Sequence, residues 1–161
     1  MVSVLFVCTG NICRSPTAEA VFRKMVREDG LEQAIAVESA GITDYHEGQA
    51  ADARARQTAR ARGIHMEDIR ARRVTAGDFT RFDYLLAMDR SHLRELQARG
   101  SRLSADVDGT RLRLFMEFAP APAPSEVPDP YYGGDEGFAR VFDMIETASW
   151  GLLEEIRRNH L

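Results

Sequence analysis

Two residues whose side chains could act together on a phosphoryl group, Cys8 and Arg14, lie six positions apart near the start of the chain. The loop between them is long enough to turn several backbone N–H groups inward and bind an anion at the start of a helix. Gly10 and Asn11 tolerate the left-handed backbone that such a loop needs. A guanidinium can bind two phosphate oxygens, and the same positive surroundings favour the thiolate of a cysteine. The loop therefore predicts Cys8 as a nucleophile and Arg14 as the phosphate-binding cation.

The residues around this loop indicate that it joins a strand to a helix. Residues 2–7 form an apolar run, interrupted only by Ser3, that is typical of a central parallel strand. Ser15 and Pro16 are residue types that open a helix, and we expect this helix to end near Gly30. Cys8 would then lie at the carboxyl end of a parallel strand, where open sheets bind ligands. The Ser15 hydroxyl could hydrogen-bond the Cys8 thiolate there.

Further along the chain, strand-like and helix-like segments alternate. Strands are predicted over residues 34–40, 82–88 and 112–118, and helices over residues 50–62, 91–99 and 134–159. This alternation predicts a single α/β domain over residues 1–161, in three layers with a four-stranded parallel sheet flanked by helices. The alternating Ala-Pro sequence of residues 119–124 suits neither a helix nor a central strand, so we expect an extended loop there.

Composition argues against several classes of function. A formal net charge of -4 disfavours a bulk nucleic-acid binder. No segment suits a signal peptide or a membrane span. The four histidines are scattered and the two cysteines share one loop, so the sequence shows no metal-ligand spacing. We therefore expect a cytoplasmic monomer that uses no metal or other cofactor and binds neither nucleic acid nor membrane.

The segment of residues 8–19, CTGNICRSPTAE, resembles the signature of the low-molecular-weight protein tyrosine phosphatases. The resemblance continues in the same order through residues 37–41, 63–65, 82–84 and 87–89 to DPYYGG at 129–134, and so covers nearly the whole chain. It implies metal-independent hydrolysis of protein phosphotyrosine through a phosphocysteine, with inorganic phosphate as product. The implied partners are phosphotyrosine-containing proteins, a tyrosine kinase being one candidate.

The resemblance also assigns roles to individual residues. Asp129, held in a rigid Pro-Asp-Pro turn, is implied as the general acid that protonates the leaving phenolate, and then as the base that activates water. The residues implied to bind the substrate are Thr9, Gly10, Asn11, Ile12, Cys13, Ser15, Tyr45, Tyr131 and Tyr132. Ser39 is implied to support the loop in a polar network with Asn11.

Four features near the site have other interpretations. The family often has a second histidine at a place that falls near Asp68 in this chain, so we expect the polar network to be built differently here. His65 is interpreted as structural, and Asp89 as a cap at the start of a helix. The arginines at positions 54 to 73 are interpreted as a solvated face.

Cys13 lies in the same loop as the candidate nucleophile. It is not needed for attack on phosphorus, but it could reach Cys8 across the loop. A reversible disulfide between the two would protect Cys8 from irreversible oxidation. We therefore hypothesise that Cys13 is a redox guard.

Three other functions remain open. A phosphoarginine phosphatase of the same family typically has a small polar residue in place of Ile12, and the apolar Ile12 favours a phenyl ring. An arsenate reductase of the same fold uses cysteines beyond the first loop, and this chain has none after Cys13. A phosphopeptide-binding module without turnover would need Arg14 and the loop amides, but not Cys8 together with Asp129.

Overall fold

The computed structural model describes residues 1–103, 111–130 and 134–161 of the chain. The described elements are, in chain order, β1 (Val2–Cys8), α1 (Arg14–Glu28), β2 (Ile35–Gly41), α2 (Ala53–Ala61), α3 (Asp78–Arg81), β3 (Tyr84–Ala87), α4 (Arg90–Arg102), β4 (Leu112–Leu114), the 3-10 helix η1 (Phe115–Phe118) and α5 (Gly134–His160). No helix within these ranges is long and apolar enough to cross a membrane.

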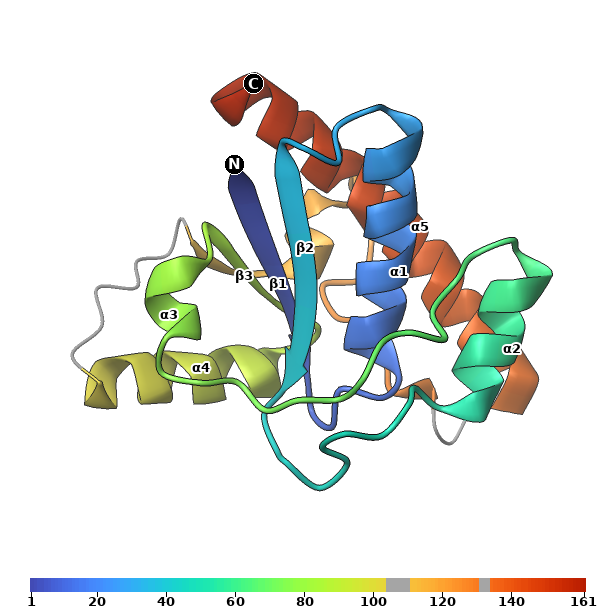
Figure 1. The fold of residues 1–161 in the computed structure, drawn as a ribbon, viewed down its shortest axis with the longest axis horizontal. Coiled ribbons are helices and arrows are strands. Elements are labelled where there is room, and N and C mark those ends of the chain that lie inside the picture. Colours follow the sequence, from blue (N-terminus) through green and yellow to red (C-terminus); the bar gives the residue numbers. More distant parts are fainter. Residues whose placement is uncertain (104–110, 131–133) are drawn as a thin grey trace.

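The four strands form one parallel sheet in the order β2-β1-β3-β4. Cys8, the last residue of β1, pairs with Gly41 at the end of β2, and Val7 pairs with Ala87 at the end of β3. Three strands therefore end side by side, and the loops that follow them meet at one edge of the sheet. This edge faces the bottom of Figure 1, whereas both termini lie at the top.

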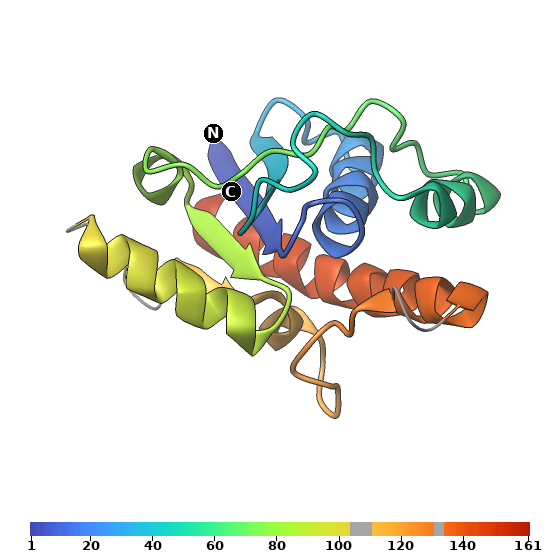
Figure 2. The same cartoon turned by 90° about the horizontal axis from the view of Figure 1, so that it is seen from below.

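Helices cover both faces of the sheet, which explains why β1 is apolar along most of its length. α1, α2 and α5 lie on one side, and α3 and α4 lie on the other (Figure 1, Figure 2). Alternate residues of β1 enter two cores, because successive side chains of a strand point to opposite faces. Val4 and Phe6 belong to the core beside α1 and α5, and Leu5 and Val7 to the core that contains Leu96 of α4. The predicted α/β fold with a four-stranded parallel sheet is confirmed.

The strand predicted over residues 112–118 is wrong in its second half. Only Leu112–Leu114 is a strand, and Phe115–Phe118 is a 3-10 helix. The leucines of β4 belong to the core beside α4, whereas the apolar side chains of η1 belong to the core beside α5. The chain thus passes from one core to the other, and a continuous apolar run cannot reveal such a crossing.

Two further boundaries differ from the predicted ones. α1 begins at Arg14, so the candidate phosphate-binding residue is itself the first residue of the helix. The short helix α3 precedes β3, and β3 begins at Tyr84 rather than at residue 82. Asp83 in this connection accepts a hydrogen bond from the backbone of Ser3 in β1 (2.9 Å), which ties the start of β3 to β1.

Candidate active site

The loop between β1 and α1 points its carbonyl groups away from its centre. Neighbouring segments donate to three of these carbonyls: Ile42 to Cys8 (2.9 Å), Thr43 to Thr9 (3.0 Å) and Asp52 to Ile12 (2.8 Å). No acceptor among the described residues takes a hydrogen bond from the backbone N–H groups of residues 9–14. These amides, at the start of a 15-residue helix, form the kind of concave donor surface that binds a phosphate group. Figure 2 is drawn from below, looking toward this edge of the sheet.

Two residues allow the tight path of the loop. Asn11 has a positive φ of 58°, a conformation that asparagine adopts more readily than most residues. Gly41, at the end of β2, lies directly behind the loop. A Cβ atom at position 41 would come within 2.8 Å of the Thr9 carbonyl oxygen, so only glycine fits there without displacing the loop.

A polar network under the loop joins the nucleophile candidate to β2. The Cys8 Sγ and Ser15 Oγ atoms share a hydrogen bond of 2.9 Å. The Asn11 side-chain amide donates to Ser15 Oγ (2.8 Å) and to Ser39 Oγ (2.9 Å). Because the Ser15 oxygen accepts from Asn11, its own proton can be donated either to the Cys8 sulfur (2.9 Å) or to the Ala40 carbonyl (3.3 Å). All four side chains are buried, so the network fixes the loop.

The network continues through Glu19, which the sequence interpretation missed. Ser39 donates to Glu19 Oε1 (2.6 Å), and Glu19 pairs with Arg23 one helical turn later. Arg23 in turn lies 3.5 Å from Asp68, near which a family histidine was expected to be missing. Burial raises the pKa of Glu19, opposed by the Ser39 hydrogen bond and the Arg23 charge. The carboxyl and guanidinium groups of α1 therefore complete the polar network in this chain.

Arg14 is buried at the end of the loop and held on one side. Its Nη1 atom donates to Asp89 Oδ2 (2.8 Å) and to the carbonyl of Val127 (3.0 Å). Burial alone would raise the pKa of Asp89, but hydrogen bonds from Ser91 and Arg14 outweigh it and lower that pKa to about 2. Asp89 is therefore a carboxylate at neutral pH, and it fixes the guanidinium.

Asp129 reaches the site on the segment that follows the Ala-Pro sequence. This segment is tied to the sheet, because the Val127 backbone donates to the carbonyl of Met88 just after β3 (2.8 Å). Asp129 and Arg14 line one cavity of about 480 Å³. The pKa of Cys13 is raised mainly by burial and, to a smaller extent, by nearby negative charges that include Asp129. The structure thus brings Asp129 close to the loop that holds Cys8 and Arg14.

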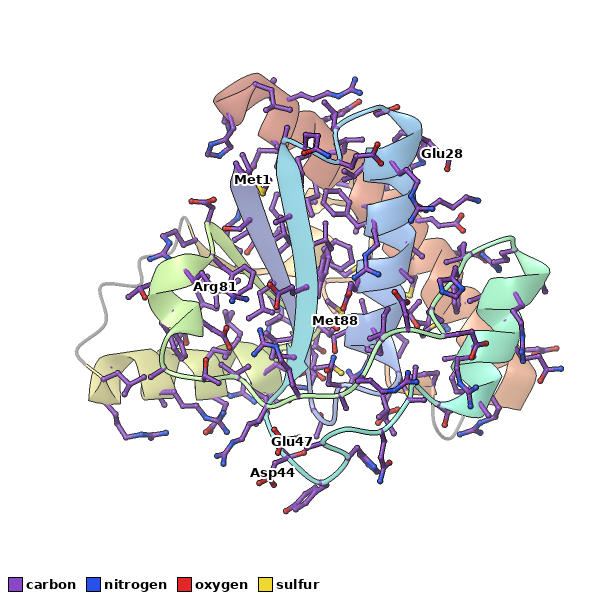
Figure 3. The ribbon with its side chains drawn as sticks, viewed as in Figure 1. Met1, Glu28, Asp44, Glu47, Arg81 and Met88 are labelled. Atoms are coloured by element: carbon purple, nitrogen blue, oxygen red, sulfur yellow. The ribbon has the colours of Figure 1, made fainter. Side chains whose placement is uncertain are left out.

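The loop after β2 borders the phosphate loop on another side. Asp44 and Glu47 of this loop lie at the bottom of Figure 3, at the end of the molecule opposite Met1 and Glu28. Its Tyr45 side chain is 80% exposed.

Packing of the loop after β2 also explains why residue 10 is a glycine. A Cβ atom on Gly10 would come within 2.9 Å of the His46 ring, so the two segments are closely packed. Tyr131 and Tyr132, the other predicted aromatic residues, lie outside the described residues.

Comparison with known proteins agrees with this geometry. The sequence model of the family described as low molecular weight phosphotyrosine protein phosphatase matches residues 3–161. The chain belongs to this family. The predicted family and enzyme class, a cysteine-dependent phosphatase, are thereby confirmed.

Individual members of the family are similar over their full length. A low molecular weight protein-tyrosine-phosphatase of Streptomyces coelicolor is 44% identical over 157 residues, which cover 96% of this chain and 93% of the relative. A crystal structure of a protein tyrosine phosphatase from Entamoeba histolytica matches with a TM-score of 0.90 and 40% identity over 100% of both chains. A Drosophila arginine phosphatase matches with a TM-score of 0.90 and 30% identity over 99% of both chains.

Residues outside the signature make contacts at this phosphatase site that their types and spacing did not predict. Asp89 caps α4, as predicted, but it also binds Arg14. Arg72 was wrongly assigned to a solvated face. Its guanidinium pairs with Asp78 (2.9 Å) and its backbone N–H donates to Asn11 Oδ1 (3.0 Å).

The contact of His92 with the site was also not predicted, although its position three residues after Asp89 is typical of a capping box. Asp89 and His92 stand in the positions of a capping box, with histidine replacing the usual Glu or Gln.

The described residues contain no group of three or more His, Cys, Asp or Glu side chains placed to hold a metal ion.

Proposed function

We propose that this chain hydrolyses phosphotyrosine in proteins in two steps, without a metal ion. The Cys8 thiolate attacks phosphorus in line with the phenolic oxygen. A sulfur–phosphorus bond forms, the phosphorus–oxygen bond breaks, and Asp129 donates its proton to the leaving oxygen. Water that gives a proton to Asp129 then attacks the phosphocysteine, releasing inorganic phosphate and the thiolate.

One observation carries the proposal: the nucleophile and the phosphate-binding groups lie in a single braced loop. Cys8 Sγ is 2.9 Å from the Ser15 hydroxyl, which can stabilise the thiolate as it is released in the second step. The loop amides and the Arg14 guanidinium can bind the three oxygens of the transferred phosphoryl group. The cavity that Asp129 shares with Arg14 supports the role of Asp129 as acid and base.

The proposal is tested with para-nitrophenyl phosphate and a phosphotyrosine peptide in the presence of a metal chelator. We expect the wild-type protein to hydrolyse both and Cys8→Ser to hydrolyse neither, because the hydroxyl of serine is a far weaker nucleophile than a thiolate. Cys8→Ser should still bind inorganic phosphate, since the loop amides and Arg14 remain. Full activity of Cys8→Ser would contradict the mechanism.

A second candidate substrate is phosphoarginine, because a Drosophila arginine phosphatase has the same fold at 30% identity. The side chain of Ile12 favours phosphotyrosine instead. It is half-buried and packs against the apolar core, and an apolar side chain in this loop suits a phenyl ring better than a guanidinium group. A direct comparison of kcat/KM for phosphotyrosine and phosphoarginine decides between them, and we expect the former to be larger.

We further propose that residues 1–161 act as one domain, as a monomer in the cytoplasm, on phosphotyrosine-containing proteins that include a tyrosine kinase. Tyr45, Tyr131 and Tyr132 are proposed to line the entrance for the aromatic ring. Light scattering after size-exclusion chromatography tests the monomer, for which the expected mass is 18.0 kDa.

A further inference from the structure

One histidine to which the proposed reaction gives no role is buried against the phosphate loop. His92 is the third residue of α4 and is 2% exposed. Its Nε2 atom lies 2.8 Å from Thr9 Oγ1, and Thr9 directly follows the nucleophile. On the other side of the ring, the backbone N–H of Asp89 donates to Nδ1 (3.3 Å).

The contacts of the ring define which nitrogen carries the proton. The Asp89 backbone N–H can only donate, so the Nδ1 atom that receives it carries no proton. The Asp89 carboxylate also lies 3.2 Å from Nδ1, but a proton on Nδ1 would oppose the N–H aimed at the same atom. A neutral ring must then carry its proton on Nε2, which donates to Thr9 Oγ1. Burial lowers the pKa of His92 to about 4, which agrees with a neutral ring.

The bond to His92 fixes the Thr9 side chain. Thr9 is now held at two atoms, because its carbonyl accepts from the Thr43 backbone (3.0 Å) and its hydroxyl oxygen accepts from His92. Among the residues that the structure describes, no other side chain or backbone group hydrogen-bonds this hydroxyl, and Thr9 is exposed, so its hydroxyl proton can be donated to a ligand.

His92 also acts on the far end of the loop, through Asp89. The His92 backbone N–H donates to Asp89 Oδ1 (3.1 Å), and the ring accepts from the Asp89 backbone, so the two residues hold each other. Asp89 Oδ2 holds Arg14 (2.8 Å). One residue of α4 is thus linked to both ends of the phosphate loop.

We propose that His92 is a positioning residue for the phosphatase reaction, holding the phosphate loop in its binding shape through Thr9 at one end and through Asp89 and Arg14 at the other. This assignment rests on the proposed function of Cys8 and Arg14. His92 does not touch the reacting atoms. Its effect is therefore measured through its partners.

A double-mutant cycle between His92 and Thr9 tests the assignment. Thr9→Val keeps the shape of the side chain but removes the hydroxyl, and we expect kcat/KM for para-nitrophenyl phosphate and the affinity for inorganic phosphate to fall roughly tenfold. His92→Ala should cost at least as much, since both links are lost. In the His92→Ala background Thr9→Val should cost less than about twofold. An equal tenfold loss in both backgrounds would overturn the proposal.

Two further variants separate positioning from a merely structural role. His92→Gln supplies one acceptor and one donor at the same position, so it should restore phosphate affinity to within about threefold of wild type. Ser91→Ala removes a different hydrogen bond to Asp89 (2.5 Å) at the start of α4 and leaves Thr9 untouched. In that background Thr9→Val should keep its full tenfold effect, and the loss of that effect would count against the proposal.

One measurement needs no variant of His92. The ¹⁵N chemical shifts of its ring in the wild-type protein report the tautomer, and we expect a proton on Nε2 between about pH 6 and 8. A proton on Nδ1 would overturn the assignment even if His92→Ala did not fold. If the wild-type protein turns over no aryl phosphate, the proposed function fails, whereas the phosphate-affinity arms still test His92. If it is active and the cycle is additive, only the assignment of His92 fails.

Discussion

In the proposed reaction the proton for the leaving oxygen comes from a single residue, Asp129. Replacing it with alanine should lower kcat by ~10²–10⁴-fold, the range typical of a positioned general acid. The affinity for inorganic phosphate should change by less than about threefold, because Arg14 and the loop amides bind the phosphate. Inhibition by phosphate and turnover of para-nitrophenyl phosphate measure the two effects.

A neighbouring carboxylate provides the control for Asp129. Glu126 lines the same cavity, but its carboxylate accepts a hydrogen bond from the backbone N–H of Arg90 (2.7 Å). Glu126→Gln should therefore retain kcat within about twofold. An equal loss in both variants would show that the cavity needs negative charge rather than an acid at position 129.

The role of Cys13 as a redox guard of Cys8 remains a hypothesis. Both cysteines are buried free thiols, and burial together with the Asp52 charge raises the pKa of Cys13 to about 12. After peroxide converts Cys8 to a sulfenic acid, the Cys13 thiol would attack that sulfur and release water. Because a protonated thiol attacks slowly, protection should be partial and should increase with pH.

The measurement is the activity recovered with a thiol reductant after peroxide treatment. Wild type should recover most of its activity, whereas Cys13→Ser should recover progressively less as its Cys8 is oxidised irreversibly. Equal recovery of the two proteins would remove the redox role of Cys13.

At the scale of elements, the packing of α5 against η1 depends on a single glycine. A Cβ atom at position 151 would lie 1.8 Å from the carbonyl oxygen of Phe118. Gly151→Ala must therefore push α5 or η1 away, and we expect a loss of unfolding free energy of about 2–4 kcal/mol in urea titration.

Another glycine of α5 provides the matched comparison. A Cβ atom at position 137 would meet its nearest neighbour, the Pro130 carbonyl oxygen, at an ordinary 3.5 Å. Gly137→Ala should be neutral or stabilise the protein by up to about 1 kcal/mol, since alanine favours helix. Similar losses at both positions would mean that α5 does not approach η1 this closely.

For the whole molecule, His92 predicts how stability depends on pH. Its pKa is lowered to about 4 in the folded protein, against about 6.5 when unfolded. Between these values the unfolded chain binds more protons, so the unfolding free energy should fall as the pH drops from about 6.5 to 4. One such group contributes on the order of 1–3 kcal/mol over this range.

The comparison with His92→Gln isolates this contribution. Glu19, whose pKa is raised by burial, changes stability in the opposite direction and is present in both proteins. Asp89, with a pKa of about 2, loses its contribution only at lower pH, as the pH falls from about 4 toward 2. Urea titrations from pH 7 to 4 should show a smaller slope for His92→Gln. The same slope in both proteins would contradict a neutral His92.

The sequence by itself determined the first loop, the alternation of strands and helices, and the candidate reaction. Apart from Ser3, residues 2–7 are apolar on both faces because the strand is covered on both faces, and such a pattern is local. The order Cys8, Gly10, Asn11, Arg14 and Ser15 is also local, because a loop that binds phosphate needs these residue types within a few positions. The strand predicted at residues 115–118 was wrong because the choice between strand and 3-10 helix is not local: it depends on which core the side chains enter.

Only the tertiary structure decided which distant residues hold this loop. Glu19, Arg72 and the pair Asp89 and His92 come from three segments, and each residue could serve as an ordinary surface or capping residue by its type alone. They act together because the parallel strands end at one edge of the sheet, which brings α1, α4 and the loops after β2 and β3 around the first loop. A sequence records residue types and spacings along the chain, whereas hydrogen bonds such as Thr9–His92, 83 positions apart, depend on strand order and register.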